Sequence, residues 1–247
     1  AGQITPDNGL EETTADWLSK ICVSGMQMGF IHIDEIEGNA AKVRDAWAQG
    51  KAAGADMVAL PEMFISGYNA QDLVMKKAFH VEAIQVIEQL AVDCADGPTL
   101  AVGGPWIEGT DLYNAYFICT GGKVIRHVLK HHLPNETVFD EVRIFSSGPL
   151  SGPYNVGDVR IGSPICEDAW HDDVTETHAE TGAEFLLVPN GSPYYRNKFE
   201  TRLNHMVGCV VETDLPLIYL NITGGQDDQV FDGGSFVLNP GGQIAVQ

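Results

Sequence analysis

Three reactive side chains stand where predicted apolar strands end: Glu62 in LPEMFISGY, Lys130 in HVLKHHLP and Cys166 in SPICEDAW. A thiol attacks as its thiolate, a carboxylate can accept the thiol proton, and an ammonium stabilises negative charge. Each residue alone also has an ordinary structural interpretation, as a loop acid, a solvated lysine and a buried cysteine. Because α/β folds gather reactive groups at strand ends, the three together predict chemistry at a cysteine nucleophile.

The flanking motifs resemble those of one enzyme superfamily. LPE…SGY, then K-x-H-L-P…FDE-x-R-x-F, then ICED-x-W occur in this order. In this the chain is similar to the nitrilase superfamily of carbon–nitrogen hydrolases, whose signature is a Glu–Lys–Cys triad in that chain order. LPNETVFDEVRIF, ICEDAW, NGSPYYRNK and GGQDDQVFDGGSF look like motifs of a narrower branch, the glutaminase domain of glutamine-dependent NAD synthetases. The resemblance runs from about Gly29 to the C-terminus.

This resemblance implies an amide hydrolase that releases ammonia from glutamine through a cysteine thioester. Cleaving an amide requires a nucleophile, an acid for the departing ammonia and positive charge where the oxyanion develops. By resemblance, Glu62 is the general base, then the acid for ammonia, and later activates the hydrolytic water. Lys130 stabilises the thiolate of Cys166 and the oxyanion, together with the backbone N–H of Glu167.

Four further residues are expected to bind the substrate or to support the triad. By resemblance Ser192 and Lys198 contact glutamine, and a lysine is a suitable partner for its α-carboxylate; the alternative is a lysine near the start of a solvated helix. Glu141 matches a second superfamily carboxylate, which orients Lys130 or meets the substrate ammonium. Tyr68 is either a pocket wall or a core tyrosine.

The chain departs from the glutaminase branch in two ways. Glu136-Thr137 follows Leu-Pro-Asn, where the branch usually has Tyr-Gly, so an acid replaces a neutral aromatic residue at the entrance. No ATP-pyrophosphatase loop of the Ser-Gly-Gly-x-Asp-Ser type occurs. We therefore expect either a free-standing amidase acting on small aliphatic or ω-amides, or a glutaminase part that works with an ATP-dependent NAD synthetase partner or missing domain. A non-catalytic scaffold subunit that keeps the fold is a third alternative.

No metal and no cofactor are predicted. His131-His132 and His171-Asp172-Asp173 contain ligand types, but no His-x-x-x-His or comparable spacing accompanies them. We interpret the first pair as structural and the second group as a helix start, where acidic side chains favour the dipole.

The composition excludes several classes of partner. The net charge of −20, with only 14 Lys and Arg, argues against nucleic acid and anionic lipid. No apolar run approaches the ~20 residues of a membrane span, and the polar, acidic N-terminus is not a secretory signal. Five scattered cysteines without Cys-x-x-Cys favour a reduced, cytoplasmic setting. The resemblance also implies a homo-oligomer.

The elements that must position the triad follow an α/β order. We expect an N-terminal arm at residues 1–25 and one hydrolase domain at 26–247, folded as a four-layer α-β-β-α sandwich of two face-packed sheets. A doubly wound single sheet is the fallback. Helices are predicted at 39–53 (capped by Asn39), 72–94, 174–181 and 199–213. Strands are predicted at 28–33, 56–60, 99–107, 112–119, 123–129, 159–165, 184–188, 217–222, 230–238 and 243–246.

Overall fold

The structure is a computed structural model that describes residues 2–3, 21–25 and 35–247. The strands in these residues form two six-stranded sheets and one two-stranded hairpin. The first sheet has the order β1 (Gly2–Gln3), β2 (Val23–Gly25), β3 (Met57–Ala59), β4 (Thr99–Glu108), β5 (Asp111–Thr120), β6 (Lys123–Leu129). The second has the order β14 (Ile244–Val246), β13 (Phe236–Leu238), β10 (Leu217–Asn221), β9 (Phe185–Asn190), β8 (Val159–Gly162), β7 (Tyr154–Val156). In each sheet three strands are parallel, β2–β3–β4 and β8–β9–β10, and their remaining neighbours are antiparallel.

The central parallel strands are apolar on both faces because each sheet is covered on both faces. In β3, Met57 and Ala59 belong to the core between the sheets, whereas Val58 faces the opposite way. In β9, Leu187 faces the first sheet, and its neighbours Leu186 and Val188 face the other side. This period-two alternation gives one core between the sheets and one outside each sheet.

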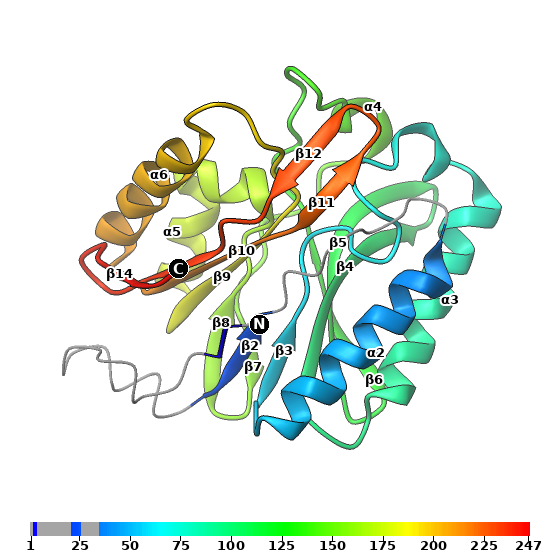
Figure 1. Ribbon diagram of the computed structural model, residues 1–247, viewed down its shortest axis with the longest axis horizontal. Coiled ribbons are helices and arrows are strands. Elements are labelled where there is room, and N and C mark those ends of the chain that lie inside the picture. The colour runs from blue at the N-terminus through cyan, green and yellow to red at the C-terminus, as the bar shows by residue number, and fades with distance from the viewer. Residues whose placement is uncertain (1, 4–20, 26–34) are drawn as a thin grey trace.

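Helices cover both outer faces. α2 (Ile36–Ala52) and α3 (Lys77–Asp93) pack on the first sheet, and α5 (Asp172–Glu180) and α6 (Lys198–Thr213) lie outside the second (Figure 1). The four-layer α-β-β-α sandwich predicted from the sequence is thereby confirmed, and the single-sheet fallback is wrong. Shorter elements lie near the sheet ends: η1 (Gln71–Leu73), α4 (Glu141–Ile144), η2 (Cys166–Trp170), β11 (Thr223–Gln226) and β12 (Gln229–Asp232).

Three local predictions differ from the structure. The strand predicted at 230–238 is two strands, β12 and β13, because Gly233 and Gly234 adopt φ of 64° and 61° between them. β12 instead pairs with β11 as a hairpin that extends past the sheets. α2 begins at Ile36, and Asn39 does not cap it, because its buried side chain donates to the Ile65 carbonyl oxygen.

The N-terminal region also differs in part. Val23–Gly25, which the sequence analysis assigns to the arm, forms β2 inside the first sheet, and Val23 is buried between the sheets. The strand predicted at 28–33 lies outside the described residues. The helix predicted from residue 72 begins at Lys77.

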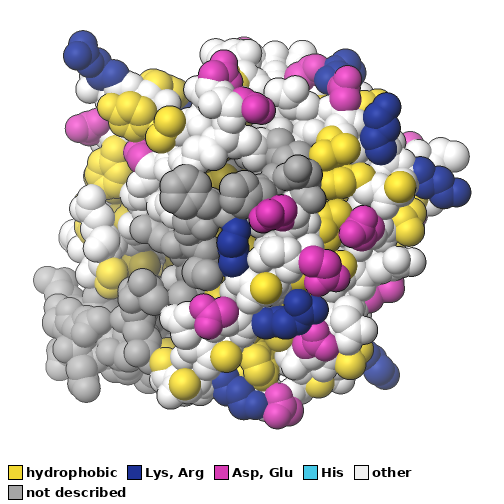
Figure 2. Space-filling view, turned by 45° about the vertical axis from the view of Figure 1, so that its right-hand side comes forward, with side chains coloured by type: hydrophobic (Ala, Val, Ile, Leu, Met, Phe, Trp, Pro, Cys, Tyr) yellow, Lys and Arg dark blue, Asp and Glu magenta, His cyan; other side chains and the backbone are white. Residues whose placement is uncertain are grey.

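Membrane spans, disulfides and surface charge can be examined in the described residues. No helix in these residues is long and apolar enough to cross a membrane. None of the five cysteines forms a disulfide. Figure 2 shows Asp and Glu side chains spread among Lys, Arg and hydrophobic residues over one face, without a large single-sign patch.

Candidate active site

The structure brings the three predicted reactive side chains together. Glu62 follows β3, Lys130 directly follows β6, and Cys166 begins η2 after β8. Lys130 Nζ lies 2.7 Å from Glu62 Oε1, and both side chains are buried. Cys166 is also buried and interacts electrostatically with both. Gly103 in β4 permits the approach of the Glu62 segment, since a Cβ there would lie 2.2 Å from the Met63 nitrogen.

A second carboxylate and an amide complete the cluster. Glu141 Oε2 lies 2.9 Å from Lys130 Nζ, so one ammonium sits between two carboxylates. Asn114 in β5 donates from Nδ2 to Glu62 Oε1 at 2.8 Å and to Glu141 Oε1 at 3.2 Å. The Gly191 backbone N–H donates to Glu62 Oε2 at 2.7 Å. Both oxygens of Glu62 are therefore held in place before any substrate binds.

Burial and charge decide the resting protonation of the cluster. Burial raises the pKa of the Cys166 thiol well above its usual value, and the charge of Glu62 raises it further, while Lys130 opposes both. Burial also raises the pKa of Glu141, against the lowering effect of Lys130. Burial alone would lower the pKa of Lys130, but the two carboxylates raise it well above its usual value. The resting thiol is thus neutral, and its proton must leave when the sulfur attacks.

Cys166 sits on a sharp turn that Asp168 holds. The cysteine has φ of 48°, a conformation that side-chain-bearing residues seldom adopt and that recurs at nucleophile turns. Asp168 Oδ2 accepts the Ile165 N–H at 3.1 Å, and its Oδ1 accepts those of His131 and His132 at 3.0 and 2.7 Å. Burial raises the pKa of Asp168 to about 7, while these donors oppose the shift. One carboxylate therefore ties the nucleophile turn to the end of β6.

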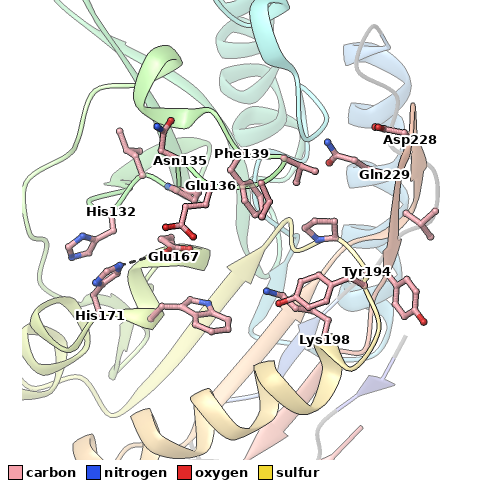
Figure 3. Close-up of a pocket in the computed structure, with 18 residues that line it drawn as sticks. His132, Asn135, Glu136, Phe139, Glu167, His171, Tyr194, Lys198, Asp228 and Gln229 are labelled. Carbon is pink, nitrogen blue, oxygen red and sulfur yellow. Dashed lines mark ion pairs between the residues drawn. The ribbon is translucent and has the colours of Figure 1, made fainter.

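A cavity of about 990 Å³ lies over this turn. Its walls are the 132–139 segment, residues of η2, the 193–198 segment and the β11–β12 turn. Figure 3 shows Glu136 and Glu167 on one side of the cavity and Lys198 on the other. Glu62, Lys130 and Cys166 are not among the residues that line the cavity, which adjoins them through Glu167, and their exposures are 1%, 0% and 5%. Glu167 is the second residue of η2, so its N–H lacks an intrahelical acceptor and can serve an oxyanion.

Of the residues expected to bind substrate, Lys198 lines the cavity, whereas Ser192 and Tyr68 are buried and do not line it. Lys198 is in the cavity, with Nζ 5.0 Å from the Trp170 ring centroid and 4.6 Å from that of Tyr195. Ser192 is buried, and its hydroxyl accepts a hydrogen bond from Arg202 Nε at 3.1 Å. Tyr68 occupies the core position rather than the cavity wall.

The Tyr68 hydroxyl has a definite partner. It donates to Glu141 Oε1 at 2.9 Å, and the ring packs in the core beside α3. Glu141 Oε1 accepts from Tyr68 and Asn114, and Oε2 lies in an ion pair with Lys130, an arrangement that fixes the carboxylate beside the lysine. Of the two roles open from the sequence, the geometry therefore favours orientation over contact with a substrate ammonium.

Sequence reasoning missed four contributors: Asn114, Asp168, the Gly191 N–H and Arg202. Arg202 has no exposed surface, yet it bonds Ser192 and lies 2.8 Å from Asp232. Two of the four carried a readable signal. Asn114 interrupts the apolar strand YNAYF, and Asp168 follows the cysteine in ICED, where a short acid can cap the turn. Beside the cavity, His131, His132 and Asp173 also bring metal-ligating atoms within 4.8 Å of one another.

Comparison with known proteins identifies the family of the chain and solved structures with the same fold. A sequence model of the carbon–nitrogen hydrolase family matches residues 21–247. The chain is 54% identical over 215 residues to the glutamine-dependent NAD(+) synthetase of Rhodobacter capsulatus, covering 87% of this chain and 39% of that protein. It is similar to the solved glutamine-dependent NAD+ synthetase of Acinetobacter baumannii in complex with ADP, at a TM-score of 0.86 and 31% identity, covering 91% of this chain and 42% of that one. An amidase from Nesterenkonia sp. shares the fold, at a TM-score of 0.76 and 24% identity, covering 90% and 83%. The chain thus spans less than half the length of the NAD synthetases that it matches.

Proposed function

We propose that this chain, which belongs to the carbon–nitrogen hydrolase family, hydrolyses the side-chain amide of glutamine at Cys166. The observation that carries the proposal is the buried Lys130, held between Glu62 and Glu141, with the buried Cys166 beside them. The 54% identity to a glutamine-dependent NAD(+) synthetase favours glutamine over other amides.

The geometry suggests a role for each group. Glu62 accepts the thiol proton as the sulfur of Cys166 attacks the amide carbon, and the same carboxyl then protonates the departing ammonia. An ammonium has three N–H donors; Lys130 donates one to Glu62 Oε1 and forms an ion pair with Glu141 Oε2. A remaining N–H is available for the oxyanion, together with the backbone N–H of Glu167. Glu62 finally activates the water that hydrolyses the thioester.

Recognition of the amino-acid end of glutamine is assigned to the cavity walls. Lys198 pairs with the α-carboxylate, and the rings of Trp170 and Tyr195 hold its ammonium group in position. Glu136 and Glu167, on the opposite side, supply negative charge for the α-ammonium. Ser192 contributes by shaping the segment before Lys198, through its bonds to Arg202.

The relatives suggest where the ammonia goes. We place the chain as the glutaminase part of a cytoplasmic NAD synthetase, with an ATP-dependent synthetase domain or partner as the acceptor of ammonia. A homo-oligomeric assembly belongs to the same proposal. A test of the partner is co-purification of the chain with such a synthetase and transfer of the glutamine amide nitrogen to its product.

Steady-state ammonia release tests the substrate. Glutamine, asparagine and propionamide are compared with the chain and with Cys166→Ala, and intact mass is recorded during turnover. We expect a strong preference for glutamine, a thioester mass on the chain alone, and no release by Cys166→Ala. Equal rates on glutamine and propionamide would support a general amidase instead. Absence of any thioester, with Cys166 unmodified by a glutamine-like electrophile, would support the scaffold alternative.

A further inference from the structure

A second cluster of reactive side chains lies at the edge of the cavity. It consists of His131, His132 and Asp173, whose ligand atoms all lie within 4.8 Å of one another. His132 Nε2 lies 2.8 Å from Asp173 Oδ1, and His131 Nε2 lies 3.9 Å from Asp173 Oδ2. The three side chains are partly exposed, at 29%, 26% and 49% respectively, so an ion can reach them from solvent.

The tautomer of His131 indicates which of its ring nitrogens could bind a metal ion. Its Nδ1 lies 2.6 Å from the Gly148 carbonyl oxygen, which can only accept, so Nδ1 carries a hydrogen. In the neutral ring Nε2 then holds a lone pair, and it lies 3.9 Å from Asp173 Oδ2, a distance too long for a hydrogen bond. A cation between His131 Nε2 and Asp173 Oδ2 would stabilise both of these electron-rich atoms. A carbonyl on the other ring nitrogen is also the usual support of a metal-binding histidine.

The backbone holds the two histidines in fixed positions. Asp168 Oδ1 accepts the N–H groups of both His131 and His132, so neither residue can move independently of η2. The His132 ring is further stacked on His171, with ring centroids 3.8 Å apart. Asp173 stands in the first turn of α5, which packs against η2 and α6. The two histidines therefore come from a pre-arranged frame, and the exposed Asp173 completes the donor set from α5.

We propose that His131, His132 and Asp173 form a binding site for Zn²⁺. Two imidazoles and a carboxylate suit zinc and its first-row neighbours, whereas Mg²⁺ and Ca²⁺ prefer sites built of oxygen atoms. The ion takes the place of the hydrogen that His132 Nε2 now shares with Asp173. Three protein ligands leave a fourth position for water. The site is separate from the triad, so its test does not depend on the proposed function.

Zinc binding is measured by competition with a chromophoric zinc indicator, using the full chain and three variants. Asp173→Asn removes one ligand. Asp172→Asn is the matched control, because it removes the same charge from the same helix turn without touching the cluster. Cys166→Ala excludes capture of zinc by the nucleophile. We expect one equivalent of zinc in the chain, in Asp172→Asn and in Cys166→Ala, and affinity lower by about 100-fold or more in Asp173→Asn.

Three results would overturn the site. These are equal affinity of Asp173→Asn and the chain, loss of zinc binding in Cys166→Ala, and no binding by the chain at micromolar zinc. Thermal unfolding without zinc checks that Asp173→Asn is folded. If it is not, His132→Gln provides the second measurement, since it keeps the backbone N–H that bonds Asp168. Unchanged affinity in a folded His132→Gln would count equally against the proposal.

Discussion

Replacing Lys130 with methionine tests whether the active site is a buried array of one cation and two anions. Lys130 has no exposed surface, and its Nζ lies 2.7 Å from Glu62 and 2.9 Å from Glu141. Methionine keeps most of the volume and removes the charge. Taking one partner from a buried ion pair costs about 3–5 kcal/mol, because an uncompensated charge stays behind. We expect that loss at pH 8, out of the ~5–15 kcal/mol by which domains are stable.

The loss should depend on pH with a definite sign. Burial raises the pKa of Glu141 and Lys130 lowers it, so Lys130→Met raises the folded-state pKa further. A carboxyl whose folded pKa lies above its unfolded value makes stability fall as pH rises between the two. The variant should therefore lose less stability relative to the parent at pH 5 than at pH 8. Each pKa unit added corresponds to about 1.4 kcal/mol.

Urea unfolding at pH 5 and pH 8 measures both quantities, with Lys123→Met as the matched control. Lys123 begins β6, the strand that Lys130 follows, but it is exposed, so its replacement should change stability little. Ammonia release by Lys130→Met should fall about 10²–10³-fold, the usual loss for one oxyanion donor. A penalty below about 1 kcal/mol at pH 8 would refute the buried-array reasoning. So would a penalty that is identical at the two pH values.

Three further substitutions probe the site. Cys166→Ser should bind glutamine yet release ammonia at less than about one thousandth of the parent rate; measurable burst formation of an ester would contradict a thiol-specific mechanism. Asn114→Leu should lower kcat about 10–100-fold with little change in KM, because it removes hydrogen bonds worth about 1.5–3 kcal/mol to the carboxylates of Glu62 and Glu141. An effect on KM alone would show that the Asn114 amide does not position these two carboxylates. Lys198→Ala should raise the KM for glutamine about 10-fold or more and leave propionamide hydrolysis unchanged. Glu200→Ala, two residues further along the same helix and exposed, serves as the control, and equal losses on both substrates would remove Lys198 from recognition.

Local patterns in the sequence were sufficient for the architecture. The apolar runs of β3 and β9 and the helical periodicity of α3 and α6 do not depend on distant partners, and they predict a layered α/β fold. Turn chemistry was harder to place, because two glycines at 233–234 end β12 without changing the apolar pattern around them. The helix start at residue 36 was missed for a similar reason, since Asn39 is a good cap by type but is used for a long-range bond.

The candidate site was predictable in its reactive residues and not in their supports. Each of Glu62, Lys130 and Cys166 is ordinary by type alone, and their order along the chain together with the flanking motifs singled them out. Tyr68 was expected as a pocket wall or a core residue and Ser192 as a glutamine contact, and the structure shows their hydroxyls bonded to Glu141 and Arg202 respectively. Side-chain type cannot show which of two partners a hydroxyl will have.

The amino-acid sequence by itself therefore determined the layers, which depend on local periodicity, and the family resemblance, whose motifs mark Cys166, Glu62 and Lys130 as the proposed nucleophile, base and cation. Tertiary structure alone decided that Asn114 bridges two carboxylates, that the Gly191 N–H reaches Glu62 across 129 residues, and that Asp173 meets two histidines. Those contacts depend on which strand ends and loops meet in space. Sheet pairing and the packing of the whole chain decide which of these segments come together, and a local stretch of sequence does not contain that information.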